Sequence, residues 1–133
     1  MKVLVTGASG FIGQHVLEAL LKKNVEIVAA TRDASKLIDF NNIKIIEIDI
    51  YSESDFYSTL GSPDILIHLV WDGLQNYKSL HHFETELPKQ YRFLKSMIES
   101  GLDTLLVSGT CFEYGMQSGA LVPNTITNPT NPY

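Results

Sequence analysis

Three glycines, at positions 7, 10 and 13, form the part of this sequence that is most typical of ligand binding. They lie within Thr6–Gly13, directly after the apolar run Val3–Val5 and directly before a segment with helical patterning. In a strand–turn–helix unit, such glycines allow a tight turn, a close approach of the backbone to a pyrophosphate, and close packing of helix on sheet. The N–H groups at the start of the helix then face an anion. Glycines also serve ordinary turns, but the flanking strand and helix favour dinucleotide binding by Gly7, Ser9, Gly10, Phe11, Ile12 and Gly13.

The residues after the second predicted strand bear on which dinucleotide would bind. Thr31, Arg32 and Asp33 follow Val25–Ala30, at the point where an NAD-selective site usually places a carboxylate against the ribose 2′-hydroxyl. An arginine beside a hydroxyl can instead bind a 2′-phosphate through charge-assisted hydrogen bonds. Thr31 and Arg32 therefore favour NADP(H), while NAD(H) stays possible. The alternative is that Arg32 is a solvated loop residue and that Asp33 binds the ribose.

The next two predicted strands end in further candidates for the cofactor site. Asp49 can accept a hydrogen bond from an adenine amino group while Ile50 packs on the ring, although an aspartate at a strand end is also a common helix cap. Three residues after the fourth strand are expected to line the path of the cofactor: Leu69, Val70 and Trp71.

The histidines and the cysteine are not predicted to bind a metal. His68 lies within an apolar strand, and we interpret it as a structural histidine bonded to backbone. His81 and His82 are adjacent, so on a helix their rings would point in different directions, and no ligand stands at metal-binding spacing from them. Cys111 has no histidine partner in the sequence, which favours a packed or cleft-wall thiol over a nucleophile.

Strand and helix patterns alternate along the chain and predict the fold. Helices are expected over Phe11–Lys23, from Ser52 to Leu60, and over Asn76–Ser100, where Pro88 would kink the helix or open a new first turn. Strands are expected over Lys2–Val5, Val25–Ala30, Ile43–Ile48, Asp64–Val70 and Thr104–Ser108. This order indicates an α/β, Rossmann-type, doubly wound parallel sheet, truncated after about five strands, with ligands beyond the carboxyl ends of the strands. From Gly109 onward the composition is that of a loop.

The composition indicates one globular domain. The chain has 133 residues, of which 44% are apolar and 19% charged, and a net charge of −5. An acidic balance argues against nucleic-acid and anionic-membrane partners. The lone cysteine fits a reducing compartment, no stretch is long and apolar enough for a membrane helix, and the strand-like start shows no signal peptide. We therefore expect a cytoplasmic protein.

The last polar block, Ser108–Gly115, follows the fifth predicted strand, and Tyr133 ends the sequence. Together with the glycine loop, the Asp49-Ile50 pair and the segment Ile67–Leu69, this block resembles the extended short-chain dehydrogenase/reductase family. That family includes nucleotide-sugar epimerases, 4,6-dehydratases and 4-ketoreductases. The resemblance covers nearly all 133 residues.

The resemblance implies a catalytic pair. The hydroxyl of Thr110 would hydrogen-bond the reacting carbonyl, with Ser108 supporting the loop. Tyr133 would be the tyrosine of a Tyr-x-x-x-Lys motif, the group that exchanges a proton with the substrate oxygen. The motif lysine, the remaining strands and the region that recognises the nucleotide-sugar would lie beyond Tyr133. We therefore expect residues 1–133 to be an incomplete NAD(P)-binding domain without competent catalysis, taken from an enzyme that is a homodimer at full length.

Departures from the family pattern narrow the expected function. Cys111 and Phe112 stand where dehydratases carry an Asp-Glu pair, and Glu113 comes one position late, which disfavours dehydration. Trp71 is bulkier than the residue that many relatives have there, and Glu86 aligns with a supporting asparagine.

With a preference for NADPH, this pattern favours a 4-keto-sugar reductase. One alternative within the family is an NAD-dependent nucleotide-sugar epimerase or dehydratase. Another is a noncatalytic NADP-sensing module, against which the pair Thr110 and Tyr133 argues.

Overall fold

The computed structural model describes residues 1–52 and 55–133. The chain falls into two compact units. The first unit comprises residues 1–70 and 89–108, and the second comprises residues 71–88 and 109–133. Among the described residues, no helix combines the length and the apolarity that crossing a bilayer requires.

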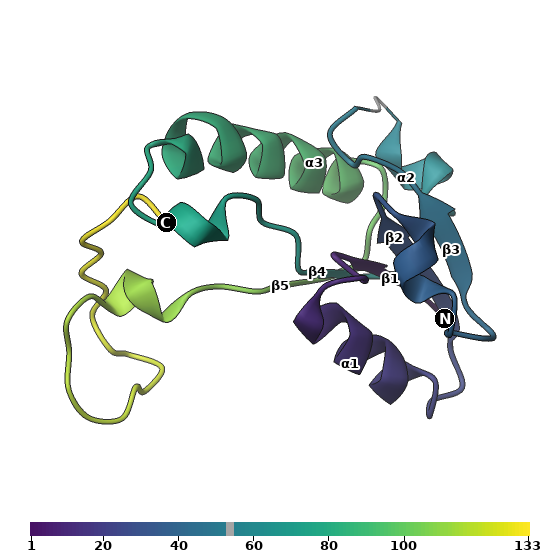
Figure 1. The fold of residues 1–133 in the computed structure, drawn as a ribbon, viewed down its shortest axis with the longest axis horizontal. Coiled ribbons are helices and arrows are strands. Elements are labelled where there is room, and N and C mark those ends of the chain that lie inside the picture. Colours follow the sequence, from purple (N-terminus) through teal and green to yellow (C-terminus); the bar gives the residue numbers. More distant parts are fainter. Residues whose placement is uncertain (53–54) are drawn as a thin grey trace. The chain divides into compact units, whose positions relative to one another are not determined.

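A parallel sheet of five strands forms the centre of the first unit (Figure 1). The order is β3-β2-β1-β4-β5, so the direction of winding reverses between β1 and β4. Val3 of β1 pairs with Ile27 of β2 on one side and with Ile65 of β4 on the other. The predicted Rossmann-type α/β fold is confirmed. The strands are β1 (Lys2–Thr6), β2 (Glu26–Thr31), β3 (Lys44–Glu47), β4 (Ile65–His68) and β5 (Thr104–Val107).

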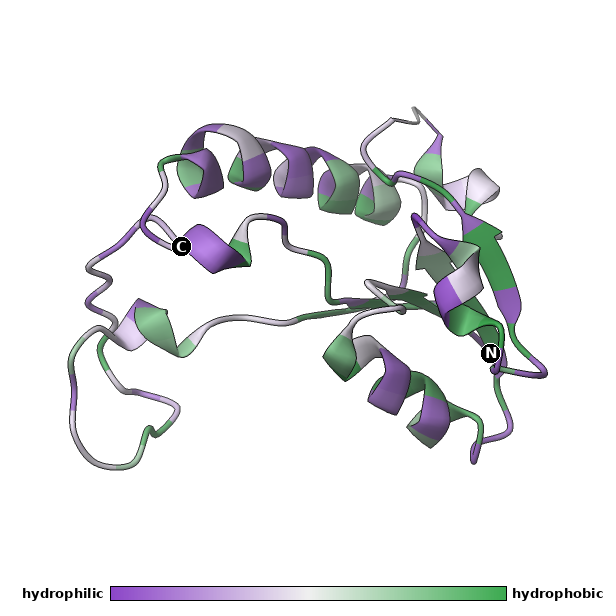
Figure 2. Ribbon diagram, viewed as in Figure 1, coloured by the Kyte–Doolittle hydropathy of each residue, from purple (hydrophilic) through white to green (hydrophobic). Residues whose placement is uncertain are grey.

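Helices cover both faces of this sheet, as Figure 1 shows for α1 (Phe11–Leu20) and α3 (Leu87–Glu99). Val3 and Val5 belong to the core cluster that contains Leu17 of α1. Leu4 belongs to the opposite cluster, with residues of α2 (Phe56–Thr59) and α3. A central strand buried on both faces needs an unbroken apolar run, and Figure 2 shows the central strands mostly in the hydrophobic colour, whereas the helices mix both colours.

Two helices are shorter than the sequence predicted. The first ends at Leu20 and not at Lys23. The second begins at Phe56, and its N-cap is Asp55, whose side chain accepts from the Ser58 N–H at 3.3 Å. Hydrogen bonds from Ser58 lower the pKa of the Asp55 carboxyl, as expected when bonds favour the charged form. The predicted start at Ser52 is wrong, and residues 53 and 54 lie outside the described residues.

The helix predicted over residues 76–100 is divided into three elements. They are a 3₁₀ turn, η2 (Leu74–Asn76), a π-helical turn, η3 (His82–Glu86), and α3. Pro88 is the second residue of α3, in agreement with the expected new first turn. In an α-helix a proline ring clashes with the carbonyl four residues earlier, and the wider π-helical turn before Pro88 accommodates the ring.

A chain of buried hydrogen bonds links the sheet to α3 in the first unit. Thr6 Oγ1 lies 2.7 Å from His68 Nδ1, and His68 Nε2 lies 2.5 Å from Gln90 Oε1. Gln90 Nε2 donates to the Val70 carbonyl at 2.9 Å and to the Tyr51 hydroxyl at 2.5 Å. Because a carbonyl only accepts, the amide oxygen of Gln90 faces His68, whose proton is therefore on Nε2. His68 is structural, but its partners are side chains and not the backbone groups that the sequence suggested.

The second unit has little regular structure beyond η2, η3 and η4 (Cys111–Tyr114). The loop after η4 returns to it, because Asn128 N donates to the Glu113 carbonyl at 2.8 Å. Gly115 has φ +66°, and a Cβ there would collide with the Asn128 carbonyl oxygen. The loop predicted from Gly109 onward is confirmed, with η4 as its one described helical turn.

The buried His68 predicts that stability falls in mild acid. Desolvation by burial lowers the pKa of His68 below its ordinary value of 6.5, although the bond with Gln90 acts in the opposite direction. Below pH 6.5 the unfolded chain therefore binds a proton more readily than the folded chain. The contribution of His68 is complete above pH 6.5 and is lost as the pH falls below that value.

Urea unfolding between pH 7.5 and pH 5 checks this expectation. The difference in unfolding free energy between the natural chain and a His68→Gln variant should shrink toward low pH. Parallel curves for the two proteins would show that His68 does not contribute to the pH dependence.

Candidate functional site

The loop between β1 and α1 has glycine where a side chain would not fit. Gly7 has φ +69°, and a Cβ there would lie 3.0 Å from the Leu69 carbonyl group. A Cβ on Gly13 would collide with the Gly7 carbonyl oxygen and would lie 2.7 Å from the Ala8 carbonyl oxygen. These are backbone atoms that cannot rotate away as the end of a flexible side chain could. Helix α1 can therefore begin directly against the loop only because position 13 has no side chain.

The N-terminus of α1 is suited to an anion. Gly10 is the N-cap and offers no side chain to the N–H groups of the first turn, which also contains no acidic residue. These N–H groups and the positive end of the helix dipole favour a bound anion. The side chains of Phe11 and Ile12 are 83% and 58% exposed, so they do not fill the space over the helix end. The residues present fit a diphosphate held by backbone groups.

The end of β2 is tied to this loop. The buried Thr31 has its Oγ1 3.0 Å from Ser9 Oγ, and it accepts from the Asp33 N–H at 3.1 Å. Arg32, which separates Thr31 from Asp33 in the sequence, is exposed. The Asp33 carboxylate caps η1 (Ala34–Leu37) by accepting from the N–H and hydroxyl of Ser35 at 3.1 and 2.5 Å. The bond with the Ser35 side chain is the main cause that lowers the pKa of Asp33.

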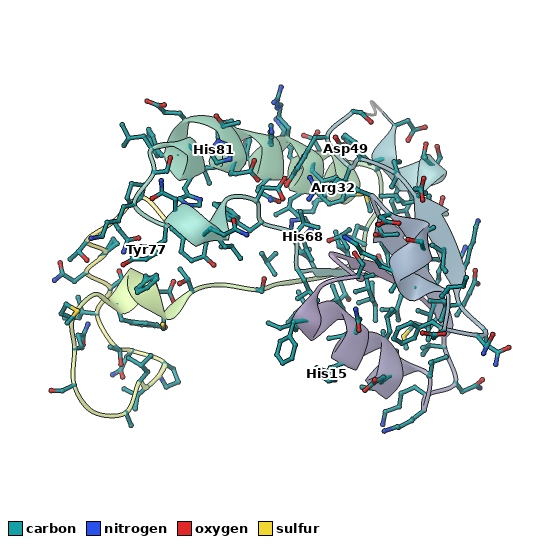
Figure 3. All side chains as sticks on the ribbon, viewed as in Figure 1. His15, Arg32, Asp49, His68, Tyr77 and His81 are labelled. Atoms are coloured by element: carbon teal, nitrogen blue, oxygen red, sulfur yellow. The ribbon has the colours of Figure 1, made fainter. Side chains whose placement is uncertain are left out.

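The end of β3 lies beside the end of β2, because Ile48 N donates to the Thr31 carbonyl at 2.8 Å. Asp49 is exposed, and its carboxylate accepts from the Tyr51 N–H at 3.1 Å. Figure 3 labels Asp49 and Arg32, which follow these neighbouring strands. Ile50 is only 6% exposed and belongs to the core, so little of its side chain is open to an adenine ring. The adenine contacts of Asp49 and Ile50 stay predictions.

The residues after β4 take different surroundings. Leu69 N donates to the Thr6 carbonyl at 3.2 Å, and its own carbonyl is the group beside Gly7. Val70 is half-buried, and its carbonyl is held by Gln90. Trp71 belongs to the second unit, where its indole N–H donates to His82 Nδ1 at 2.9 Å. The indole N–H is therefore already used within the protein.

The second unit contains both predicted catalytic residues. Thr110 is the N-cap of η4, and its Oγ1 accepts from the Phe112 N–H at 3.2 Å. Because the oxygen accepts this bond, the hydroxyl proton can be donated to a substrate oxygen. The ring centroid of Tyr133 lies 6.2 Å from that of Phe112 and 5.8 Å from that of Trp71. Thr110 and Tyr133 thus both contact Phe112, whereas Ser108 belongs to the first unit and donates to the His68 carbonyl.

The sequence did not predict the contacts of His82 and Glu86, two buried residues of the second unit. His82, to which the sequence assigned no site, packs its ring against the Tyr133 ring, with centroids 5.2 Å apart. Glu86 accepts from the Asp72 N–H at 3.3 Å and lies 3.4 Å from the His81 ring nitrogen. Their four-residue spacing is a signal that could have predicted a shared buried helix face. Within residues 1–52 and 55–133, no three His, Cys, Asp or Glu side chains are grouped as a metal site would require.

Comparison with known proteins identifies the family of this chain. The model of the "NAD dependent epimerase/dehydratase family" matches residues 3–133. The chain belongs to this family. The resemblance to the extended short-chain dehydrogenase/reductases is therefore confirmed at the level of the family.

Two curated relatives of this epimerase/dehydratase-family chain match it from end to end. It is 32% identical over 136 residues to dTDP-6-deoxy-L-talose 4-dehydrogenase (NAD(+)) of Aggregatibacter actinomycetemcomitans, covering 100% of this chain and 50% of that protein. It is 27% identical over 143 residues to the UDP-glucose 4-epimerase of Halalkalibacterium halodurans, covering 100% of this chain and 42% of that protein. The chain thus spans about half the length of the curated relatives it matches.

A solved structure supports the same assignment. The UDP-glucuronic acid 4-epimerase of Bacillus cereus, crystallised with UDP-glucuronic acid and NAD, superposes with a TM-score of 0.81 at 25% identity. The match covers 99% of this chain and 47% of the epimerase chain.

The glycine loop gives a direct test of the cofactor site. A Gly13→Ala variant should lose dinucleotide binding and about 1–3 kcal/mol of stability, because overpacking against backbone forces α1 away from the loop. Isothermal titration calorimetry with NAD and NADP would measure binding, and urea unfolding would measure stability. Gly109→Ala is the matched control, because a Cβ at Gly109 meets nothing within 4 Å. Unchanged binding by Gly13→Ala would contradict the role of this loop.

Proposed function

We propose that this chain is the NAD(P)-binding domain of an oxidoreductase that acts on a nucleotide-linked sugar, and that the reaction is the reduction of a 4-keto sugar. The observation that carries the proposal is the shared contact of Thr110 and Tyr133 with Phe112. It brings a hydroxyl that can donate, bonded to the backbone of Phe112, and a phenol that can give up a proton, packed on the Phe112 ring, to one residue. General acid catalysis requires such groups within reach of one substrate oxygen.

The proposed reaction assigns a separate task to the backbone at the start of α1, to Thr110 and to Tyr133. When bound, the nicotinamide cofactor supplies a hydride to the carbonyl carbon of the sugar and is itself oxidised. The backbone N–H groups at the start of α1 hold the diphosphate. Thr110 donates a hydrogen bond to the carbonyl oxygen, which stabilises the charge that develops there. Tyr133 gives its proton to the same oxygen, so that the carbonyl becomes an alcohol, and then regains a proton from solvent.

The relatives support an oxidation or reduction at the sugar. The name of one relative describes a 4-dehydrogenase that uses NAD(+), and reduction of a 4-keto sugar is the same hydride transfer in reverse. Glu113 also disfavours dehydration, because its hydrogen bond with Tyr114, which raises the pKa of that phenol, already engages its side chain. The second candidate is a nucleotide-sugar 4-epimerase, which the name of another relative favours.

The NADP(H) preference is part of the proposal. Two of the relatives described above are named with NAD, but the end of β2 in this chain supports the phosphorylated form. The residue at the end of β2 is Thr31 and not an acid, and the nearest carboxylate, Asp33, is engaged in capping η1. Arg32 is then the charged group beside the ribose position, where it can bind a 2′-phosphate.

Removing the phenol of Tyr133 tests the catalytic role. In the enzyme of natural length, Tyr133→Phe keeps the ring that packs on Trp71, His82 and Phe112. The turnover number should fall about 10²- to 10⁴-fold because the proton donor is gone, while the Kd for the cofactor should stay the same. Steady-state kinetics and calorimetry would measure the two quantities.

Tyr114→Phe is the matched control, because it removes another phenol of the same unit. It should leave turnover near the natural value. Retained turnover in Tyr133→Phe would refute the catalytic role and would favour a noncatalytic NADP-sensing module. The proposal also requires a lysine four positions after Tyr133 in the natural gene.

Arg32→Ala tests the cofactor preference. Loss of a charge-assisted contact with the 2′-phosphate should weaken NADPH binding by about 1.5–3 kcal/mol, whereas NADH binding should not change. Calorimetric titrations with both cofactors would measure this. Lys22→Ala, which removes a positive charge just after α1, is the control and should change neither affinity. Equal NADPH affinity before and after Arg32→Ala would refute the proposed contact.

A further inference from the structure

The buried His82 is fixed in one orientation by two hydrogen bonds. The Trp71 indole N–H donates to His82 Nδ1 at 2.9 Å, and His82 Nε2 lies 3.0 Å from the Asn76 carbonyl oxygen. An indole N–H can only donate, and a carbonyl oxygen can only accept. The imidazole must therefore carry its proton on Nε2 and accept at Nδ1. His82 is fully buried, so solvent does not compete with either partner.

The ring of Tyr133 packs against this fixed pair. Its centroid lies 5.2 Å from that of His82, at an interplanar angle of 51°, and 5.8 Å from that of Trp71, at 63°. The Trp71 and His82 rings are themselves stacked, with centroids 6.2 Å apart and an angle of 26°. Aromatic pairs at such separations attract each other in preferred relative orientations. One hydrogen bond, from Trp71 to His82, thus sets the surface against which the phenol ring lies.

The same hydrogen bonds exclude proton transfer between His82 and Tyr133. Both imidazole nitrogens are engaged with other groups, so neither is available to the phenol. The neighbouring His81 ring lies 6.0 Å from His82, and its own nitrogen lies 3.4 Å from the Glu86 carboxylate. The contribution of His82 to Tyr133 is therefore one of geometry.

We propose that Trp71 and His82 are positioning residues for Tyr133, and that the indole–imidazole hydrogen bond fixes the direction in which the phenol points. This inference rests on the proposed role of Tyr133 as the proton donor. It also gives Trp71 a different role from the one predicted from the sequence, in which Trp71 lined the path of the cofactor. The direction of the phenol matters because a catalytic group misplaced by about 1 Å can lower the reaction rate about 10²-fold.

A double-mutant cycle in the enzyme of natural length tests this pair. Trp71→Phe removes the indole N–H and keeps an aromatic ring, and His82→Phe removes the acceptor and also keeps a ring. Each should lower kcat by about ten- to hundredfold and leave the Kd for the cofactor and the KM for the sugar unchanged. Because the two residues act through one bond, the double variant should lose no more than either single variant.

NMR of ¹⁵N-labelled histidine gives an independent measurement in the natural protein. His82 should be in the Nε2–H tautomer only. Trp71→Phe should keep that tautomer, because the Asn76 carbonyl still accepts from Nε2, but it should shift the Nδ1 signal, because Nδ1 loses its donor. A His82 that is not in the Nε2–H form in the natural protein would overturn the proposal, even if the variants fail to fold. Tyr91→Phe, on the exposed side of α3, is the matched control and should leave both kcat and the His82 signals unchanged.

The possible failures can be told apart. Natural kcat in Trp71→Phe, or losses that multiply in the double variant, would overturn the positioning role while the proposed function stands, provided that Tyr133→Phe is inactive. Full turnover in Tyr133→Phe would instead overturn the proposed function itself.

Discussion

The first unit depends on a contact of backbone with backbone, at the point where α1 begins beside the loop that follows β1. Gly13 lies so close to the Gly7 carbonyl that no side chain fits between them, and Gly7 in turn lies against the Leu69 carbonyl. The loop can therefore contact both the end of β4 and the start of α1 only because positions 7 and 13 have no side chain. Because winding reverses between β1 and β4, this contact also occupies the place where open α/β sheets bind their ligands.

The two units are stabilised by different interactions. In the first, apolar clusters on both faces of the sheet surround one internal polar chain, in which every donor from Thr6 to Gln90 has an acceptor. A fully satisfied network of this kind specifies a single arrangement of its members. The second unit relies on stacked aromatic rings and on a loop that closes between Glu113 and Asn128. Rings and loop closures set the position of Tyr133 without a large core.

The sheet and the glycine loop could be predicted from the sequence because their signals are local. Apolar runs define the strands, and the glycine spacing follows from steric limits within one turn of chain. The helix ends were less predictable, since Ser52 and Asp55 are both good cap residues and the bond from Ser58 selects Asp55. The partners of His68 and His82 could not be predicted, because Gln90 and Trp71 are 22 and 11 residues away along the chain. The role of Asp33 as a cap could not be predicted although its partner, Ser35, is only two residues away. An aspartate at that position can either cap the next turn or bind a ribose, and the sequence does not distinguish the two.

Trp71 is the only tryptophan of the chain, and it lies in ring contact with both His82 and Tyr133. Its fluorescence therefore comes from a single place, the immediate surroundings of the predicted proton donor. A nearby phenol and imidazole alter the emission of an indole. A rearrangement of the Tyr133 or His82 ring should therefore change the emission of Trp71. The fluorescence of Trp71 thus reports on the surroundings of His82 and Tyr133 without any added label.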